Sequence, residues 1–387
     1  AIEIMYISSI LKKKNEVHYT RDLKDQAINK ADYIILPSSI IAHETEIHAL
    51  EHLHNKKIFV TGIFGNTLKN KYLKENSIVV KNESDTFFFN LDKEEKLNKE
   101  YLDKLFRDKN LINQFYSTVS LDELPFPDWE SYTKVYPLRN NFFSLNEKIA
   151  IPLLGTRGCP YSCFNYCTYP LQQGRKVRAR SIENIIKEIK YWQKTLGTNK
   201  FVFRDPVFSI NRKHTIHFCE EVIRQKLNIT FMVETHLNNL DDEMIKLLAN
   251  AGLELVYVGI ESASHVVLKD MQRFTIEHDE QYKIIKKCEE MGIKVKTMFI
   301  IGNPEDTEQS VIETIKYSKH LPSLYSQYSI FTPYPGTPIY ADYKDLIYEK
   351  KMENFDQYQL TFKHNHLSES KIEELKSQAY FNFYFNF

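Results

Sequence analysis

The chain has 387 residues, 42% of them hydrophobic and 26% charged, a composition typical of a globular protein with a substantial core. Its 51 lysines and arginines balance 51 aspartates and glutamates, so net charge favours neither nucleic acid nor an anionic membrane as a partner. No apolar run approaches the ~20 residues that span a bilayer, no secretory signal opens the chain, and five cysteines suit a reducing compartment, so we expect a cytoplasmic protein.

The first third of the chain alternates predicted helices and strands. Residues 1–17 have the pattern of an amphipathic helix with no strand before it, so we expect the natural N-terminus to lie further upstream. The runs "DYIILPSS" (32–39), "KKIFVTGIFG" (56–65) and "NSIVVKNES" (76–84) are apolar and end in polar or glycine residues, a pattern that predicts buried strands. With helices between these strands, residues 1–120 are predicted to form a Rossmann-like, doubly wound parallel sheet.

A second run of strand–helix pairs follows a predicted linker. Residues 121–145 begin with "LDELPFPDWESY", which has two prolines and no period and therefore predicts the linker. Residues 146–345 contain six apolar strands in strict alternation with helices, of which the first helix has Ser181 as its N-cap. This alternation predicts a partial (β/α)6 barrel of the TIM type, with its active site at the carboxyl ends of the strands. Residues 346–387 are predicted to be a helical and aromatic extension.

The segment "GCPYSCFNYCTYP" (158–170) places Cys159, Cys163 and Cys167 within nine positions. A structural zinc site would need a fourth ligand, and the other two cysteines lie in predicted helices. Three unrelated buried cysteines are the remaining alternative. A [4Fe–4S] cluster held by three thiolates fits better, because these cysteines follow a strand in a loop that Gly158 and Pro160 bend.

This loop resembles the hallmark of the radical S-adenosylmethionine (SAM) enzymes, C-x3-C-x-aromatic-C, with one extra residue between Cys163 and Cys167. The resemblance implies that the three thiolates hold a [4Fe–4S] cluster whose fourth iron binds SAM. The segments "FRDPVFSIN", "VETHLNNLD", "GIES", "IIGNPED" and "TPYPGTP" resemble later strand ends of the same barrel, in the same order. By this resemblance, the residues expected to contact SAM are Tyr166, Asp205, Glu234, Gly259, Glu261, Ser262, Gly302 and Glu305.

Residues 1–120 and the linker resemble the cobalamin-binding domain that precedes the barrel in cobalamin-dependent members of this family. The resemblance implies a cobalamin site at the strand ends, with contacts expected from Ser38, Ser39, Thr61, Gly62, Gly65 and Asn66. The chain has no Asp-x-His-x-x-Gly motif, so we expect no histidine below the cobalt. The four histidines at positions 43, 48, 52 and 54 lie on a predicted helix and are interpreted as solvated or packed side chains.

The basic run Arg175, Lys176, Arg178 and Arg180 has two interpretations. It is either a solvated face or a set of charges that neutralises the surroundings of the cluster or a substrate anion.

The resemblance implies a cobalamin-dependent radical SAM methyltransferase. Such an enzyme methylates an unactivated carbon, or a phosphorus centre, with a 5′-deoxyadenosyl radical and methylcobalamin. A rearrangement or cyclisation enzyme without methyl transfer is one alternative, and a dehydrogenase or epimerase whose sheet no longer binds cobalamin is another. A non-catalytic iron–sulfur protein would need none of the strand-end motifs. The implied partners are a small-molecule or peptide natural product and an electron donor such as flavodoxin or ferredoxin, but no nucleic acid or membrane.

Overall fold

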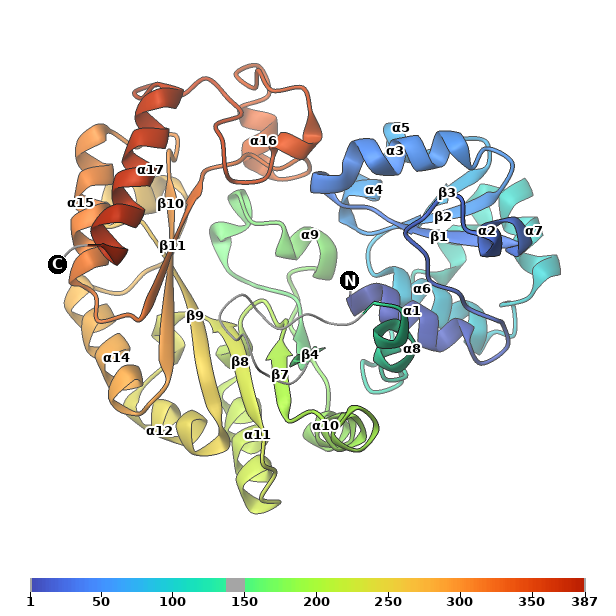
Figure 1. Cartoon of the computed structure of the whole chain (residues 1–387), viewed down its shortest axis with the longest axis horizontal. Coiled ribbons are helices and arrows are strands. Elements are labelled where there is room, and N and C mark those ends of the chain that lie inside the picture. Colours follow the sequence, from blue (N-terminus) through green and yellow to red (C-terminus); the bar gives the residue numbers. More distant parts are fainter. Residues whose placement is uncertain (1, 137–149, 386–387) are drawn as a thin grey trace. The chain divides into compact units, whose positions relative to one another are not determined.

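The computed structural model describes residues 2–136 and 150–385. The chain divides into two compact units, residues 1–139 with 171–173 and residues 140–170 with 174–387 (Figure 1). The finer predicted division into a sheet domain, a linker, a barrel and an extension stays a prediction, and its boundary at residues 145 and 146 lies outside the described residues. Among the described residues, no helix has the length and apolar character needed to cross a membrane.

The first unit is built on a parallel sheet with strands in the order β1 (Tyr33–Pro37), β2 (Lys57–Thr61) and β3 (Ser77–Val79). Each strand coincides with one of the predicted apolar runs. The helices and 3-10 turns (η) of this unit are α1 (Ile2–Leu11), α2 (Gln26–Lys30), η1 (Ile40–Ala42), α3 (His43–His52), α4 (Ile63–Thr67), α5 (Lys69–Tyr72), α6 (Ser84–Lys93), α7 (Lys99–Arg107), η2 (Lys109–Phe115) and α8 (Trp129–Val135).

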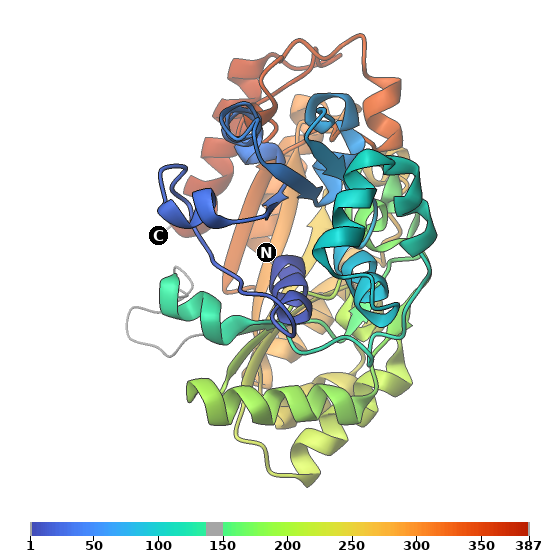
Figure 2. The same cartoon turned by 90° about the vertical axis from the view of Figure 1, so that its right-hand side faces the viewer.

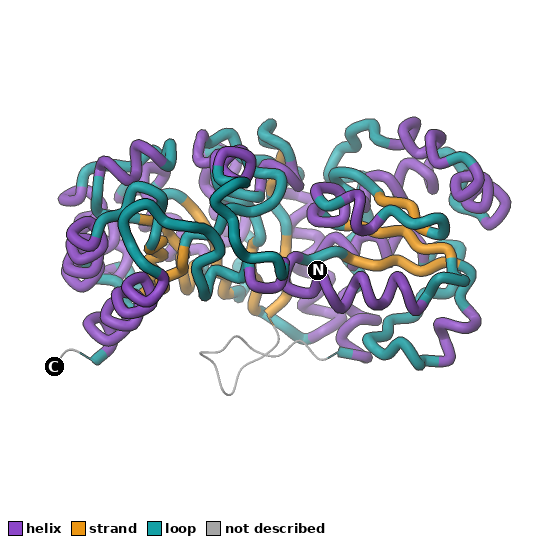
Figure 3. The backbone as a smooth tube through the Cα atoms, turned by 90° about the horizontal axis from the view of Figure 1, so that it is seen from above, coloured by secondary structure: helices purple, strands orange, loops and turns teal. Residues whose placement is uncertain are grey.

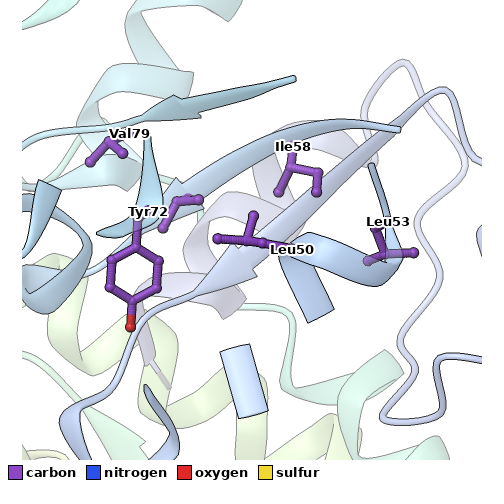
Figure 4. Packing of buried hydrophobic residues seen from close by; sticks show 6 residues of the cluster. Leu50, Leu53, Ile58, Tyr72 and Val79 are labelled. Carbon is purple, nitrogen blue, oxygen red and sulfur yellow. The ribbon is translucent and has the colours of Figure 1, made fainter. Parts of the chain in front are cut away.

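One face of the central strand β2 packs against the helices that connect the strands. Ile58 and Val60 are both fully buried, because alternate residues of a strand point to the same face. The apolar cluster on this face contains Leu50, Leu53, Ile58, Val60, Tyr72 and Val79 (Figure 4). Its members outside the sheet are Leu50 of α3, Leu53 at the C-cap of α3, and Tyr72 of α5.

The other face of β2 packs against a second layer of helices. Phe59 lies edge-on to Phe88 of α6 and to Phe106 of α7, with ring centroids 5.3 and 5.0 Å apart. Figure 2 faces this unit and shows α6 and α7 together on one side of its strands. Helices therefore cover both faces of the sheet, and the predicted Rossmann-like, three-layered fold is confirmed.

The first part of the predicted linker is not an irregular connection. Asp128 caps α8 by accepting a hydrogen bond from the backbone N–H of Ser131, and Trp129 is buried at 1% exposure. Asp128 also accepts from Ser8 of α1 at 2.7 Å, so the segment before α8 is fixed to the first helix. The two prolines suggested a linker, but the capping aspartate and the buried tryptophan fold residues 129–135 into a helix. Residues 137–145 of the predicted linker lie outside the described residues.

The second unit contains a six-stranded, all-parallel sheet whose strands follow one another in chain order. These strands are β4 (Ala150–Leu153), β7 (Lys200–Phe203), β8 (Thr230–Thr235), β9 (Leu253–Glu261), β10 (Lys294–Ile301) and β11 (Tyr325–Ile330). Because each new strand joins the same edge, the strands form an open arc with helices on its outer side (Figures 1 and 3). The predicted partial (β/α)6 barrel is confirmed.

The connecting elements also agree with the predicted alternation. Ser181 accepts a hydrogen bond from the backbone N–H of Asn184 and is the N-cap of α10, as predicted. A two-stranded antiparallel pair, β5 with β6, precedes this helix and was not predicted. The remaining elements are β5 (Thr156–Arg157), η3 (Ser162–Asn165), α9 (Tyr169–Gln173), β6 (Arg178–Ala179), α10 (Ile182–Leu196), η4 (Phe208–Ile210), α11 (Arg212–Arg224), η5 (Leu237–Asn239), α12 (Asp242–Ala251), α13 (His265–Asp270), α14 (His278–Glu290), α15 (Glu308–His320), α16 (Pro338–Asp342), η6 (Met352–Asn354) and α17 (Glu369–Tyr384).

Candidate functional site

The inner face of the six-stranded sheet is the less buried one. Along β8, β10 and β11 buried residues alternate with half-buried residues. The buried set lies under the helices, so the half-buried set lines the inside of the arc. Glu234 near the end of β8 and Glu261 at the end of β9 both belong to the half-buried set. The carboxyl ends of parallel strands lie at one edge, so these two carboxyl groups lie at the same end of the partial barrel.

The three clustered cysteines lie in one loop that follows β4 and β5. Cys159 and Cys163 are buried, at 5% and 8% exposure, and Cys167 is half-buried. The carbonyl of Cys163 accepts hydrogen bonds from the backbone N–H groups of Tyr166 and Cys167, at 3.2 and 3.0 Å. This turn, which includes η3, accommodates the extra residue between the second and third cysteines. The loop is therefore partly a 3-10 turn rather than wholly irregular.

The thiols affect one another's ionisation. Burial is the main cause that raises the pKa of all three thiols, and it raises that of Cys167 to about 12. The charges of neighbouring cysteines raise the pKa values of Cys159 and Cys167 further. Backbone N–H groups of Tyr161 and Tyr169 donate to Cys159 and Cys167 respectively and oppose this rise. Hydrogen bonds from backbone amides to sulfur are a feature of iron–sulfur sites, so the donors fit such a cluster.

A zinc ion is the alternative group for this loop. Within residues 2–136 and 150–385, no three His, Cys, Asp or Glu side chains come close enough together to hold one ion. A zinc ion draws its ligands into a tight tetrahedron, whereas each thiolate of a [4Fe–4S] cluster binds a different iron and stands further from the others. The group that the three thiols bind stays a prediction.

Asp205, at the end of β7, has a defined role in the fold. Its two carboxyl oxygens accept hydrogen bonds from the backbone N–H of Gly155, at 2.8 Å, and from the hydroxyl of Thr156, at 2.7 Å. Burial raises its pKa to about 6. Because both oxygens are engaged, Asp205 joins the end of β7 to the beginning of the cysteine loop. The predicted contact of Asp205 with SAM stays a prediction.

Glu234 lies close to the cysteine loop. The hydroxyl of Tyr169 donates to its Oε2 at 3.3 Å, and burial raises the pKa of Glu234 to about 7, with the nearby guanidinium of Arg204 opposing the rise. Glu234 also contributes to the raised pKa of Cys167. The predicted site residue Tyr166 belongs to the loop itself, and its ring centroid lies 6.2 Å from that of Phe331.

The "GIES" segment at the end of β9 is joined to the cysteine loop by Arg273, which the sequence analysis did not identify. The Arg273 guanidinium donates to the carbonyl of Gly259 at 2.8 Å, and Nη1 lies 3.9 Å from Sγ of Cys163. Its Nη2 lies 3.6 Å from Oε1 of Glu261. Burial raises the pKa of Glu261, and Arg273 opposes this rise. Ser262 is turned toward α15, where its hydroxyl meets that of Thr314 at 3.2 Å.

The turn after β10 contains the last two predicted SAM residues. Gly302 has a positive φ of +76°, and Glu305 is exposed on the same turn. The turn is fixed by Asp306, which accepts from the backbone N–H of Asn303 at 2.9 Å, and by His364, whose Nε2 lies 2.7 Å from the Asn303 carbonyl oxygen. The predicted site residues of the second unit thus occupy the ends of four strands and the cysteine loop, but their contact with SAM stays a prediction.

The residues of the basic run after the cysteine loop differ in their surroundings, so they do not all fit the same interpretation. Arg180 is buried and pairs with Glu188, at 2.5 Å, so its charge has a role in the fold. Arg175 donates to the carbonyl of Pro160 at 2.7 Å, and its charge lowers the pKa of Cys159. Lys176 is exposed. The charge of Arg175 thus acts on a cysteine of the loop, as the second interpretation expects.

In the first unit, the predicted cobalamin residues meet at the ends of β1 and β2. The hydroxyl of Ser38 donates to the carbonyl of Thr61 at 2.7 Å and accepts from the backbone N–H of Gly65 at 2.6 Å. A Cβ added to Gly62 would lie 2.9 Å from the Ser38 carbonyl oxygen, so the chain is close-packed here. The hydroxyl of Thr61 is buried and has no hydrogen-bond partner among the described residues. Close-packed glycines and an unpaired hydroxyl fit a polar ligand at this edge.

The other two predicted cobalamin residues adjoin this group. The backbone N–H of Ser39 donates to Glu46 at 2.7 Å, and Asn66 is half-buried in α4. Of the four helical histidines, His43 is buried with Nδ1 2.9 Å from the hydroxyl of Tyr72, and the other three are exposed. His43 is thus packed and the other three are solvated, whereas the expectation that no histidine lies below the cobalt stays a prediction.

Part of the second unit is similar to a known family. Residues 153–318 match the sequence model of the radical SAM superfamily, so the predicted resemblance is confirmed for this segment. An uncharacterized methyltransferase of Pyrococcus horikoshii is 28% identical over 267 residues, 68% of this chain and 56% of that protein. The bacteriochlorophyllide d C-12(1)-methyltransferase of Chlorobaculum tepidum is 28% identical over 241 residues, 60% of this chain and 52% of that protein.

A third relative has a different activity. The anaerobic magnesium-protoporphyrin IX monomethyl ester cyclase of Rubrivivax gelatinosus is 27% identical over 231 residues, 59% of this chain and 39% of that protein. The chain thus spans about half the length, or less, of these curated relatives.

Solved structures share the fold of both units. The cobalamin-dependent SAM radical enzyme OxsB, with aqua-cobalamin bound, has a TM-score of 0.73 at 13% identity, covering 99% of this chain and 64% of that one. The radical SAM methyltransferase TsrM of Kitasatospora setae, with tryptophan and a SAM analogue bound, has a TM-score of 0.64 at 14% identity, covering 89% of this chain and 73% of that one. At these identities the likeness concerns the fold.

Proposed function

We propose that this chain, whose residues 153–318 form a radical SAM domain, is a cobalamin-dependent radical SAM methyltransferase. The observation that carries the proposal is the loop of Cys159, Cys163 and Cys167 at the end of the barrel where Glu234 and Glu261 also lie. In the proposal these thiolates hold a [4Fe–4S] cluster and leave one iron for SAM.

The residues of the chain have three tasks in this proposal. Tyr166 and the residues around the loop shield the thiolates from water, which favours a dry site for radical chemistry. Glu234, with a pKa raised to about 7 by burial, and Glu261 offer carboxyl oxygens to the ammonium or ribose groups of SAM. Gly302 and the turn after β10 hold the adenine. When bound, the cluster with SAM supplies a radical for hydrogen abstraction, and methylcobalamin supplies a methyl group.

Two observations support cobalamin as the second cofactor. OxsB, which binds aqua-cobalamin, shares the fold of nearly the whole chain. The ends of β1 and β2 bring together Ser38, Thr61 and Gly62, with a buried Thr61 hydroxyl that lacks a partner among the described residues. We propose that these residues, with Ser39, Gly65 and Asn66, contact the corrinoid.

The relatives include methyltransferases and a cyclase, and these two activities suggest the proposed reaction and its alternative. The named activity of the Chlorobaculum tepidum relative is a methyl transfer to a bacteriochlorophyllide, and TsrM was solved with tryptophan. We propose methyl transfer to a carbon or phosphorus centre of a small-molecule or peptide substrate. The cyclase of Rubrivivax gelatinosus supports the second candidate, a ring closure without methyl transfer.

The test begins with the cofactors, since no substrate needs to be known. Anaerobically reconstituted protein is incubated with SAM, cobalamin and a low-potential reductant, and iron, bound cobalamin, 5′-deoxyadenosine and S-adenosylhomocysteine are measured. We expect about four irons per chain, retained cobalamin and 5′-deoxyadenosine. S-adenosylhomocysteine formed together with 5′-deoxyadenosine supports methyl transfer, and its absence supports the cyclase-like alternative.

Matched cysteine variants separate the cluster from general effects on folding. Cys163→Ala should lose iron and all 5′-deoxyadenosine formation. Cys219→Ala removes an equally buried thiol of α11, outside the loop, and should keep both. Iron binding that survives Cys163→Ala, or four bound irons without SAM cleavage in the wild-type protein, would contradict the proposal.

A further inference from the structure

The segment Gln272–Phe274, between α13 and α14, joins the cysteine loop to the ends of two strands. The hydroxyl of Ser162 donates to the carbonyl of Gln272 at 2.8 Å, and Nε2 of His236, just after β8, lies 2.9 Å from the carbonyl oxygen of Phe274. The backbone of this segment therefore holds the loop on one side and the end of β8 on the other. Arg273 stands at its centre.

The Arg273 side chain is a cation with little exposure to solvent. Only 11% of it is exposed, and its guanidinium contacts the Gly259 carbonyl at 2.8 Å, Glu261 at 3.6 Å and Sγ of Cys163 at 3.9 Å. A buried guanidinium is costly unless hydrogen bonds and negative charge compensate it. An arginine guanidinium is not deprotonated in proteins, so Arg273 places a permanent cation beside Glu261 and the cysteine loop.

The backbone around Arg273 is adapted to this position. Glu261 has a φ of +67°, a conformation that is unfavourable for a residue with a Cβ. A Cβ at Gly259 would lie 2.2 Å from Oε1 of Glu261 and 3.0 Å from Nη2 of Arg273. Local strain that persists marks a site where the surrounding structure imposes it. Here it allows the guanidinium to lie against the carbonyl of β9 and the sulfur at once.

We propose that Arg273 is the positioning residue that holds Cys163 for cluster binding and raises the reduction potential of the cluster. This inference rests on the proposed function. Reduction adds one electron from an external low-potential reductant and makes the cluster more negative by one charge, with no bond formed or broken in the protein. A fixed, poorly solvated cation about 4 Å from a ligating sulfur favours the more negative state. Arg273 therefore makes the cluster easier to reduce.

The test is the midpoint potential of the reconstituted cluster, measured by a redox titration followed by electron paramagnetic resonance without SAM. In Arg273→Gln we expect a midpoint more negative by 59 mV or more, a tenfold fall in the ratio of reduced to oxidised cluster at a fixed potential. Arg273→Lys keeps the charge but not the fork of donors, so its midpoint should lie between the two. Arg224→Gln is the matched control, because the Arg224 side chain in α11 is 68% exposed and pairs with Glu221, outside the cysteine loop.

A second variant keeps the inference falsifiable if Arg273→Gln does not bind a cluster. Glu261→Gln removes the negative partner and leaves the cation, so its midpoint should shift in the opposite, more positive direction. The inference would be overturned if either Arg273→Gln or Glu261→Gln bound a full cluster with an unchanged midpoint potential. It would also be overturned if the midpoint potentials of both variants shifted in the same direction. A wild-type protein that binds no cluster would overturn the proposed function and this inference together. A cluster with normal SAM cleavage and unmoved midpoints would overturn this inference alone.

Discussion

A single side chain, Tyr384 of α17, satisfies both backbone groups of Ser326 on the last strand of the sheet. The N–H of Ser326 donates to the Tyr384 hydroxyl at 2.9 Å, and this hydroxyl donates to the Ser326 carbonyl at 2.8 Å. One turn earlier, the hydroxyl of Tyr380 makes the same pair of bonds to Tyr328, at 3.2 and 3.3 Å. The two tyrosines thus occupy the open edge of β11, where a neighbouring strand would otherwise pair.

Removing these hydroxyls should weaken the sheet and free its edge. Tyr384→Phe should lower the free energy of unfolding by about 0.5–1.5 kcal/mol, because two hydrogen bonds are lost at a partly wet edge. The double variant Tyr380→Phe/Tyr384→Phe should also self-associate, which light scattering measures. Tyr358→Phe, at an exposed tyrosine, is the control and should change neither property. A double variant as stable and monodisperse as the wild type would refute the edge role.

The need for glycine at position 259 can be tested with a compensating change. Gly259→Ala should displace Glu261 and Arg273, because the new Cβ would lie 2.2 Å from Oε1 of Glu261. We expect a loss of about 1–3 kcal/mol in the free energy of unfolding. Adding Glu261→Ala removes the clashing carboxyl group and should restore part of that loss, as a double-mutant cycle measures. Two independent, additive losses would show that the clash is not the cause.

Much of this site could be predicted from local patterns. The strand ends were predictable because apolar runs that stop at Pro, Gly or Ser mark parallel strands. The position of the three cysteines in a loop after a strand was predictable in the same way, whereas their role as cluster ligands stays a prediction. Helix α8 was missed because Pro125 and Pro127 dominated the interpretation, although Asp128 was available as a capping residue.

Arg273 could not have been found in the same way. It lies 110 residues after Cys163 and 14 after Gly259, and no periodic pattern relates an arginine between two helices to either of them. The role of Asp205 was similarly hidden. A carboxylate at a strand end predicts a ligand contact, but only the three-dimensional structure shows that its two oxygens face Gly155 and Thr156. Contacts of this kind depend on how the chain folds back, which one sequence does not specify.

The carboxyl group of Asp205 should make stability fall as the pH rises. Its pKa is raised by burial from 3.8 to about 6, so between these values the folded protein holds a proton that the unfolded chain has released. The contribution of Asp205 to stability is therefore greatest below pH 4, is lost by about 1–3 kcal/mol as the pH rises to about 6, and changes little above that value. Asp205→Asn removes this titration. The difference in unfolding free energy between the variant and the wild type should therefore change between pH 4 and pH 6. A pH-independent difference would contradict the assignment.

Cobalamin binding offers the sharpest test of the first unit, because two glycines share a backbone conformation but not their surroundings. Gly62 has φ +88° and ψ 165°, and Gly174 has φ +78° and ψ 179°. Alanine at either position is strained by about 1–3 kcal/mol. At Gly62 the new Cβ would also lie 2.9 Å from the Ser38 carbonyl oxygen, whereas at Gly174 it would meet nothing within 4 Å.

Gly62→Ala should therefore spread the ends of β1 and β2 and weaken cobalamin binding at least tenfold. Gly174→Ala should keep the wild-type affinity. Equilibrium dialysis measures both affinities. Equal affinities in a folded Gly62→Ala protein would place the corrinoid elsewhere.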